Sequence, residues 1–177
     1  MNNNNNIVLR RLLDNDAEYK ILEKWYQEKE IYSHFEQRKL TYNEIKDKYL
    51  PRTLDNTLIP VFMIEYNSQP IGIIQYQLIN EDNKKLYNIN SNNCYEIDIF
   101  IGELKLHNKG LGKRSINLLS KYLFDKKKAD MLVMCPLKNN ISAIRCYENC
   151  DFKILNDFKA EDTIGNIENF ICMIRKR

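Results

Sequence analysis

The stretch EIDIFIGELKLHNKGLGKRSINLLSKY, residues 96–122, decides how the chain folds. Apolar and polar residues alternate at its start, as they do in a strand, and its second half places Ile116 and Leu119 at helical spacing. A polar loop containing Gly110 and Gly112 joins the two parts. The sequence therefore predicts a strand, a tight turn and an amphipathic helix over these residues.

The turn has the features of an anion-binding site. The first backbone N–H groups of a helix have no partners inside the helix, and glycine lets the backbone approach a phosphate closely. Lys109, Lys113 and Arg114 add positive charge beside the glycines. Short glycine motifs are common in unrelated proteins, so an ordinary solvated loop is the alternative interpretation.

The strand ahead of the turn carries two carboxylates. Glu96 and Asp98 alternate with Ile97 and Ile99, so both acids are expected on one face of the strand. Carboxylates next to an anion-binding turn suit a second substrate that is a cation. The alternative interpretation is that this face is only the solvated side of a strand.

Length and composition indicate one globular domain, residues 1–177, since 44% of the residues are hydrophobic and 29% are charged. The net charge of +3 comes without a long basic block, which argues against nucleic acid as a partner. No apolar run is long enough to span a bilayer. The N-terminal sequence MNNNNN lacks the regions of a signal peptide, so a disordered tail over residues 1–6 and a cytoplasmic location are expected.

The five cysteines are scattered, and only Cys146 and Cys150 have helical i,i+4 spacing. No second cysteine pair or histidine pair completes a zinc pattern, so reduced and mostly buried thiols are expected, with no metal. The two histidines, His34 and His107, are far apart in the sequence, which disfavours a metal site or a serine–histidine triad.

Hydrophobic periodicity and turn residues predict the other elements. The predicted strands cover residues 7–13, 60–66, 71–79, 96–102, 130–135, 152–155 and 166–174. The predicted helices run from Asp14 or Asp16 to about 29, from 41 to about 49 with Pro51 as the stop, from the glycine turn past 119, and from Asn139 or Asn140 to about 149. This order indicates a mixed sheet with helices on its faces, in the α/β or α+β class.

Three details bear on the site. Thr41 and Glu44 have the form of a capping box. The single tryptophan, Trp25, is interpreted either as a core anchor or as a wall of a substrate cleft, and its helical spacing favours the core. The asparagine-rich stretch 80–94 is predicted to be a loop, either functional or a flexible connection between strands.

Two segments together resemble the GNAT superfamily of acetyl-CoA-dependent N-acetyltransferases: HNKGLGKRS at 107–115, directly after a strand, and NNISAIRCYENCDF at 139–152. The matching positions are Gly110, Gly112, Asn140, Ala143, Tyr147 and Phe152. With IEYNSQPIGIIQYQ at 64–77 and EIDIFIGE at 96–103, the chain is similar to aminoglycoside 6'-N-acetyltransferases. The resemblance implies a mainly antiparallel central sheet with helices on both faces.

The resemblance also implies roles for individual residues. Asp98 orients the amine and accepts its proton, directly or through water, and Tyr147 donates to the departing thiolate; a core position against Phe152 is the alternative for Tyr147. The implied contacts to acetyl-CoA are Ile99, Phe100, Ile101, His107, Lys109, Gly110, Leu111, Gly112, Lys113, Arg114, Asn140 and Ala143. The implied contacts to the amine are Trp25, Gln75 and Asp98, to which strand geometry adds Glu96.

Three positions depart from the family pattern. His107 stands where Gln or Arg is usual, Asp151 replaces a glycine, and Cys135 replaces an aspartate that some similar enzymes have before the proline. Three functions are therefore compatible with the sequence. They are an aminoglycoside 6'-N-acetyltransferase, a GNAT enzyme for another amine such as a polyamine, metabolite or protein N-terminus, and an inactive acetyl-CoA-binding module. Similar proteins are often homodimers, although no feature of this sequence establishes a dimer.

Overall fold

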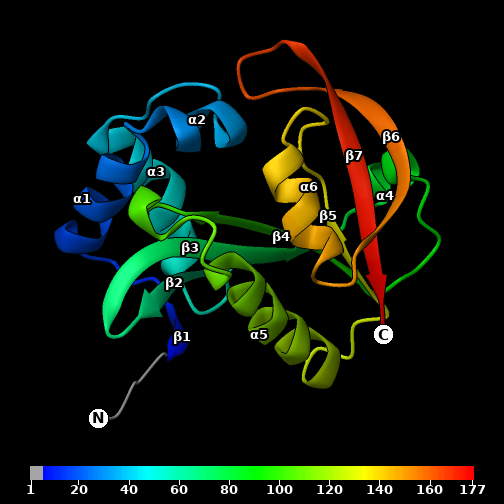
Figure 1. Ribbon diagram of the computed structural model, residues 1–177, viewed down its shortest axis with the longest axis horizontal. Helices are drawn as coiled ribbons and strands as arrows, with labels where there is room; N and C mark the ends of the chain where they lie inside the picture. Colours follow the sequence, from blue (N-terminus) through cyan, green and yellow to red (C-terminus); the bar gives the residue numbers. More distant parts are fainter. Residues whose placement is uncertain (1–5) are drawn as a thin grey trace.

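The computed structural model describes residues 6–177, and its strands form one sheet in the order β1-β2-β3-β4-β5-β7-β6 (Figure 1). Neighbouring strands run antiparallel except β4 and β5, which are parallel. The strands are β1 (Ile7–Arg11), β2 (Val61–Tyr66), β3 (Gln69–Leu78), β4 (Cys94–Ile101), β5 (Met131–Met134), β6 (Lys153–Glu161) and β7 (Ile167–Lys176). The predicted class, a mixed and mainly antiparallel sheet, is confirmed.

Helices cover both faces of this sheet, as predicted. They are α1 (Asp16–Trp25), α2 (Lys29–Phe35), α3 (Tyr42–Thr53), α4 (Glu81–Tyr87), α5 (Leu111–Asp125) and α6 (Ile141–Glu148), with a short 3-10 helix at Leu104–Leu106. One apolar core lies between α5, α6 and the sheet, around Ile97, Ile116 and Leu119. A second lies between α1, α2, α3 and the other face, around Trp25 and Phe100.

The parallel pair β4–β5 separates soon after it forms. The register pairs only Cys94 with Met131, Tyr95 with Leu132, and Glu96 with Val133. Beyond this point β4 continues to Ile101 beside β3, while Pro136 follows β5 and leads the chain toward α6. The divergence leaves the second half of β4 without a strand partner on that edge, and this gap becomes the site.

The stretch 80–94 contains a helix, so its prediction as a loop is wrong. The Asn80 side chain accepts from the N–H of Asn83 at 2.8 Å and caps α4 at its start, and Asn88 ends the helix with φ 54° and ψ 47°. Asparagine favours caps and left-handed positions as well as loops. The same residues that suggested irregular structure are the ones that bound a short helix.

Other boundaries also differ from the predictions. The capping box of Thr41 and Glu44 is confirmed, but α3 continues through Pro51 to Thr53. Pro51 lies in the last turn, where it costs one hydrogen bond, to the carbonyl of the exposed Asp47. Helix α1 is capped by Asn15, whose side chain accepts from the Glu18 N–H at 3.0 Å, and not by either predicted aspartate.

The C-terminal hairpin is longer than predicted. Strand β6 runs to Glu161 rather than 155 because it pairs with β7 along its whole length, from Lys153 with Ile174 to Glu161 with Ile167. Its turn reaches the connection that follows α2, where Thr163 Oγ1 donates to Gln37 Oε1 at 2.7 Å (Figure 1). The β6–β7 turn and the connection between α2 and α3 are therefore in contact.

Two further findings concern the limits of the chain. Of the predicted disordered tail, residues 1–6, all but Asn6 lie outside the described residues. Among the helices of residues 6–177, none combines the length and the apolar character that crossing a membrane requires.

Candidate active site

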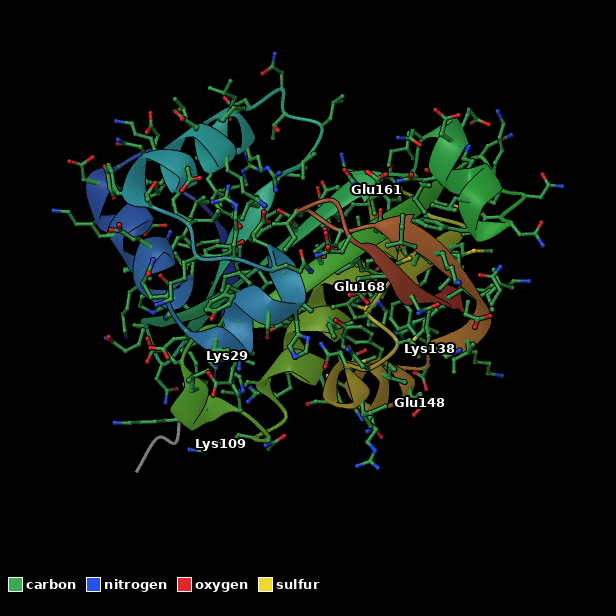
Figure 2. The ribbon with its side chains drawn as sticks, turned by 90° about the horizontal axis from the view of Figure 1, so that it is seen from above. Lys29, Lys109, Lys138, Glu148, Glu161 and Glu168 are labelled. Atoms are coloured by element: carbon green, nitrogen blue, oxygen red, sulfur yellow. The ribbon has the colours of Figure 1, made fainter. Side chains whose placement is uncertain are left out.

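A cavity of about 810 Å³ opens where β4 and β5 diverge. Residues 97–101 of β4 form its floor, α5 and α6 form one side, and α2 reaches its rim with Glu30, Ile31, His34 and Phe35. Figure 2 labels Lys109, in the turn before α5, and Glu148, at the end of α6. The strand–turn–helix unit predicted from the sequence thus lines one continuous cleft.

The turn before α5 is an open anion site. Gly110 occupies the left-handed region with φ 73° and serves as the N-cap, and no side chain caps the helix there. The first intrahelical bond runs from the Arg114 N–H to the Gly110 carbonyl, so the N–H groups of Leu111, Gly112 and Lys113 remain available to a ligand. The helix dipole adds partial positive charge at the same point. A phosphate-bearing ligand fits this end of the cleft.

His107 ties the turn to the strand. Its Nε2 lies 2.6 Å from the carbonyl oxygen of Ile101, and since a carbonyl can only accept, Nε2 carries the proton. The turn therefore keeps a fixed position relative to β4 even though His107 replaces the usual family residue. His107 also lines the cavity.

Helix α6 contributes the other long wall. Asn140 caps it by accepting from the Ala143 N–H at 3.1 Å, which confirms one of the two predicted caps. Tyr147 lines the cavity with its ring against Phe152, at a centroid distance of 6.5 Å. Within residues 6–177 the structure gives the Tyr147 hydroxyl no hydrogen-bond partner. Burial raises its pKa, so the phenol stays protonated and available as a donor.

Asp98 lies on the cleft floor and is held by a chain of two hydrogen bonds. Gln75 Nε2 donates to Asp98 Oδ2 at 2.9 Å, and Arg52 Nη1 donates to Gln75 Oε1 at 2.7 Å. Gln75 is opposite Asp98 in the β3–β4 register. Burial raises the pKa of Asp98, while the bond from Gln75 and the charges of Arg52 and Lys48 oppose that shift. The result is a carboxylate with a fixed direction and increased basicity.

Glu96 sits two residues earlier on the same face. Its carboxylate accepts from Gln77 Nε2 at 3.1 Å and from the Tyr87 hydroxyl at 3.0 Å. Burial and the charge of Asp98 raise the pKa of Glu96 to about 7. The predicted common face is therefore confirmed, and the alternative of a solvated face is wrong for Glu96, which is 7% exposed. Glu96 does not line the cavity itself.

Trp25 belongs to the core and not to the cleft. Its side chain is 0% exposed, and its Nε1 donates to Glu103 Oε1 at 2.9 Å. A Cβ atom on Gly102 would lie 2.1 Å from Trp25 Cδ2, so the indole packs directly on the end of β4. The expected contact between Trp25 and an amine is corrected, and the core interpretation suggested by its spacing is confirmed.

The remaining predicted residues divide into two groups. Those that line the cavity are Asp98, Ile99, Phe100, Ile101, His107, Gly110, Leu111, Gly112, Lys113, Asn140, Ala143 and Tyr147. Lys109 and Arg114 are exposed outside it, and Gln75 is buried with both ends of its amide bonded inside the protein. The predicted contact between Gln75 and the amine is therefore replaced by a role in orienting Asp98.

Sequence reasoning missed the contribution of α2 and α3. His34 and Phe35 line the cleft, and Lys48 and Arg52 act on Asp98 from α3. Lys48 is itself ion-paired with Glu36. The one signal of Arg52 was Gln75 itself, a polar residue on a buried strand. Its amide both donates and accepts, so when the N–H bonds Asp98, the amide oxygen still needs a donor.

The cysteines do not build a metal site. All five are free, and Cys94, Cys150 and Cys172 are buried, which agrees with the prediction that most of the thiols are buried. Across residues 6–177, no three His, Cys, Asp or Glu side chains gather closely enough to hold a metal ion. Cys135 lines the cleft beside Glu96.

The geometry brings together an anion site, a basic carboxylate and a phenol donor along one cleft. Such a set can bind a phosphate-bearing group at one end, take a proton from a cation near Asp98, and give a proton at Tyr147. The two proton functions come from different elements, Asp98 from β4 on the floor and Tyr147 from α6 on the side.

Comparisons with known proteins agree with this geometry. Residues 14–160 match the family described as "Acetyltransferase (GNAT) domain". The aminoglycoside N(6')-acetyltransferase type 1 of Klebsiella pneumoniae is 24% identical over 155 residues, which cover 86% of this chain and 76% of the relative.

Two solved structures share the fold at low identity. The aminoglycoside acetyltransferase AAC(6')-Ib in complex with coenzyme A and kanamycin has a TM-score of 0.76 and 20% identity, covering 97% of this chain and 95% of the other. The spermidine N-acetyltransferase of Vibrio cholerae in complex with CoA and spermine has a TM-score of 0.76 and 21% identity, covering 96% and 95%.

Proposed function

The chain belongs to the GNAT acetyltransferase family, and from this premise we propose that it transfers the acetyl group of acetyl-CoA to the 6'-amine of an aminoglycoside. One observation carries the proposal: Asp98, oriented by Gln75 and Arg52, lies in the same cleft as the open N-terminus of α5. A cationic amine and a phosphate-bearing donor would then meet over β4.

The residues present fit the coenzyme. The free N–H groups of Leu111, Gly112 and Lys113 suit a pyrophosphate, and the edge of β4 around residues 99–101, which β5 does not pair, suits an extended amide-containing arm. Acetyl-CoA supplies the acetyl group as a thioester. The protein supplies binding groups, orientation and the two proton-transfer groups.

The chemistry needs two proton transfers. The amine nitrogen bonds to the acetyl carbon as the carbon–sulfur bond breaks, so the amine loses one proton and the thiolate gains one. Asp98, whose pKa is raised by burial, accepts the proton of the amine, directly or through water. Tyr147, held protonated by burial, donates to the sulfur.

Substrate choice rests on the negative groups near Asp98. Aminoglycosides and polyamines are polycations, and Glu96 and Asp98 lie together on one strand face. The curated relative favours an aminoglycoside, while the neighbour solved with spermine favours a polyamine as the second candidate. Cys135, in place of an acidic residue, keeps the second candidate open.

The test is product identification after incubation with acetyl-CoA and single amines. We expect acetylation of an aminoglycoside that bears a 6'-amine and no acetylation of its 6'-hydroxyl analogue, with NMR assigning the acetylated nitrogen. Acetylation of spermidine but of no aminoglycoside would replace the first candidate by the second. Binding of acetyl-CoA with no transfer to any amine would contradict both and support an inactive binding module.

A further inference from the structure

Helix α4 directs one side chain at Glu96, the carboxylate that stands behind Cys135 of the cleft wall. The hydroxyl of its last residue, Tyr87, donates to Glu96 Oε1 at 3.0 Å. The Tyr87 ring packs against Phe158 of β6 at a centroid distance of 5.0 Å, and Asn156 Nδ2 donates to the Tyr87 carbonyl at 2.8 Å. Tyr87 is therefore held from β6 while its hydroxyl points at the carboxylate.

Three polar side chains converge on Glu96. Tyr87 of α4 and Gln77 Nε2 of β3 donate to it, the latter at 3.1 Å, and the Cys135 thiol, directly after β5, adjoins it. Donors directed at a carboxylate favour its ionised form. Within residues 6–177 no cationic side chain forms an ion pair with Glu96. A buried negative charge that is hydrogen-bonded but unpaired is an arrangement that an external cation would stabilise.

The surroundings of Glu96 otherwise oppose ionisation. The titratable groups facing it are Asp98 on its own strand, Tyr87 on α4 and Cys135 directly after β5, with Cys172 of β7 in contact with Cys135. Burial and the charge of Asp98 raise the pKa of Glu96 to about 7, and the bonds from Gln77, Tyr87 and Cys135 lower it. The charge of Glu96 near neutral pH therefore depends on these donors.

We propose that the Tyr87–Glu96 pair makes the site selective for substrates that carry more than one ammonium group. The inference rests on the proposed function, in which Asp98 receives the proton of the reacting amine. Glu96 then acts on a second ammonium group that keeps its charge. Two residues along a strand span about 6.6 Å, a spacing that suits two nitrogens of one polycation.

Glu96 is a positioning residue rather than a contact residue in this proposal. Its side chain is 7% exposed and stands behind Cys135, which lines the cleft. Because the intervening protein has a low effective dielectric, the charge is felt across this short distance. Tyr87 is the specificity switch, since its hydroxyl helps to decide whether that charge is present.

The variant Tyr87→Phe removes only the hydroxyl. We expect the preference for spermidine over propylamine, measured as the ratio of the two kcat/KM values at neutral pH, to fall about tenfold, the usual effect of one charge-assisted hydrogen bond. The KM for acetyl-CoA should stay the same. The KM for spermidine should fall with rising pH as Glu96 ionises. In the variant the midpoint of this fall should move to higher pH, because the Glu96 carboxylate loses a donor.

Tyr95→Phe is the matched control. Tyr95 adjoins Glu96 on β4 but points to the other face of the sheet, into the core under α5 and α6. There its ring packs on Tyr76 at a centroid distance of 5.7 Å. An unchanged selectivity ratio and an unchanged pH midpoint in Tyr87→Phe would overturn the inference. Equal losses for both amines would also overturn it, because they would show a merely structural role.

Calorimetric titration separates this inference from the proposed function. Spermidine and propylamine are titrated into wild-type protein and Tyr87→Phe, each saturated with coenzyme A. A selective loss of spermidine affinity in the variant supports the inference even if no amine is acetylated, in which case the proposed function alone fails. Equal affinities in the two proteins overturn the inference even if turnover is normal.

Discussion

Tyr147 lines the cleft from α6. Its hydroxyl has no hydrogen-bond partner within the described residues, and its ring packs on Phe152. Replacing it by phenylalanine keeps the packing and removes the proton donor. We expect kcat of Tyr147→Phe to fall by about 10- to 100-fold, at the lower end for a lost general acid, with little change in the KM for acetyl-CoA. Steady-state release of free coenzyme A measures both. A KM that rose while kcat held would assign Tyr147 to binding instead.

Arg52 makes a second test at this scale, since its hydrogen bonds reach Asp98 through Gln75 and its charge acts on Asp98 as well. Arg52→Met leaves the amide of Gln75 free to rotate and removes a positive charge that opposes the raised pKa of Asp98. The acid limb of the pH–rate profile should therefore move to higher pH. Arg38→Met, on an exposed ion pair with Glu44, is the control and should leave the profile unchanged. An unmoved limb in Arg52→Met would remove Arg52 from the account of the site.

The sequence was sufficient to place Asp98, Gly110 and Tyr147, because each belongs to a local motif whose spacing survives folding. It was not sufficient for Arg52, which reaches the site from α3, or for Tyr87, which lies only nine residues before Glu96 but on a helix that was predicted as a loop. Trp25 was misassigned as a substrate contact because the family resemblance was followed there, whereas its helical spacing had favoured the buried position that it occupies. Such contacts are set by packing, which no local pattern encodes.

Among the elements, the turn before α5 and the turn between β6 and β7 each hold one glycine, and the two form a matched pair. Gly110 (φ 73°) caps α5, and Gly165 (φ 85°) lies in the β6–β7 turn, and an added Cβ would meet no atom within 4 Å at either position. Alanine at either site should cost about 1 kcal/mol through backbone strain. Only Gly110→Ala should also raise the KM for acetyl-CoA, by about tenfold, since the N–H groups that it positions would shift. Equal KM values in the two variants would show that the turn does not hold the coenzyme.

Helix α4 shows why element prediction failed where it did. Its seven residues carry too few apolar positions for a periodic signal, and asparagines at both ends imitate a loop. Strand β6 failed differently, since its alternation is hidden by charged residues on its exposed face and becomes evident only in the pairing with β7. By contrast, α5 was predictable because fifteen residues display one apolar stripe.

For the whole molecule, the buried pair of carboxylates carries a stability cost. Glu96 has a pKa raised from 4.5 to about 7, so the folded state binds more protons than the unfolded state between those values. Stability is thus highest below the unfolded pKa and falls as the pH rises through the folded one. Glu96→Gln should therefore stabilise the protein above pH 7, by up to about 3 kcal/mol, and have little effect near pH 4.

Thermal unfolding at several pH values checks this expectation. The rise in Tm of Glu96→Gln over wild type should grow between pH 4 and pH 7 and then level off. The exposed Glu148→Gln is the control and should show no such trend. A variant less stable than wild type above pH 7 would mean that the hydrogen bonds to Glu96 outweigh its burial and its repulsion by Asp98.

The central claim, that this cleft transfers an acetyl group to an amine by way of Asp98, is tested most directly by one comparison. Initial rates of coenzyme A release from acetyl-CoA are measured for wild type and Asp98→Asn with the best amine substrate, and acetyl-CoA binding is measured in parallel. The account predicts a loss of at least about 100-fold in kcat/KM for the amine, with acetyl-CoA affinity retained. Amine acetylation at the wild-type rate by Asp98→Asn would contradict it.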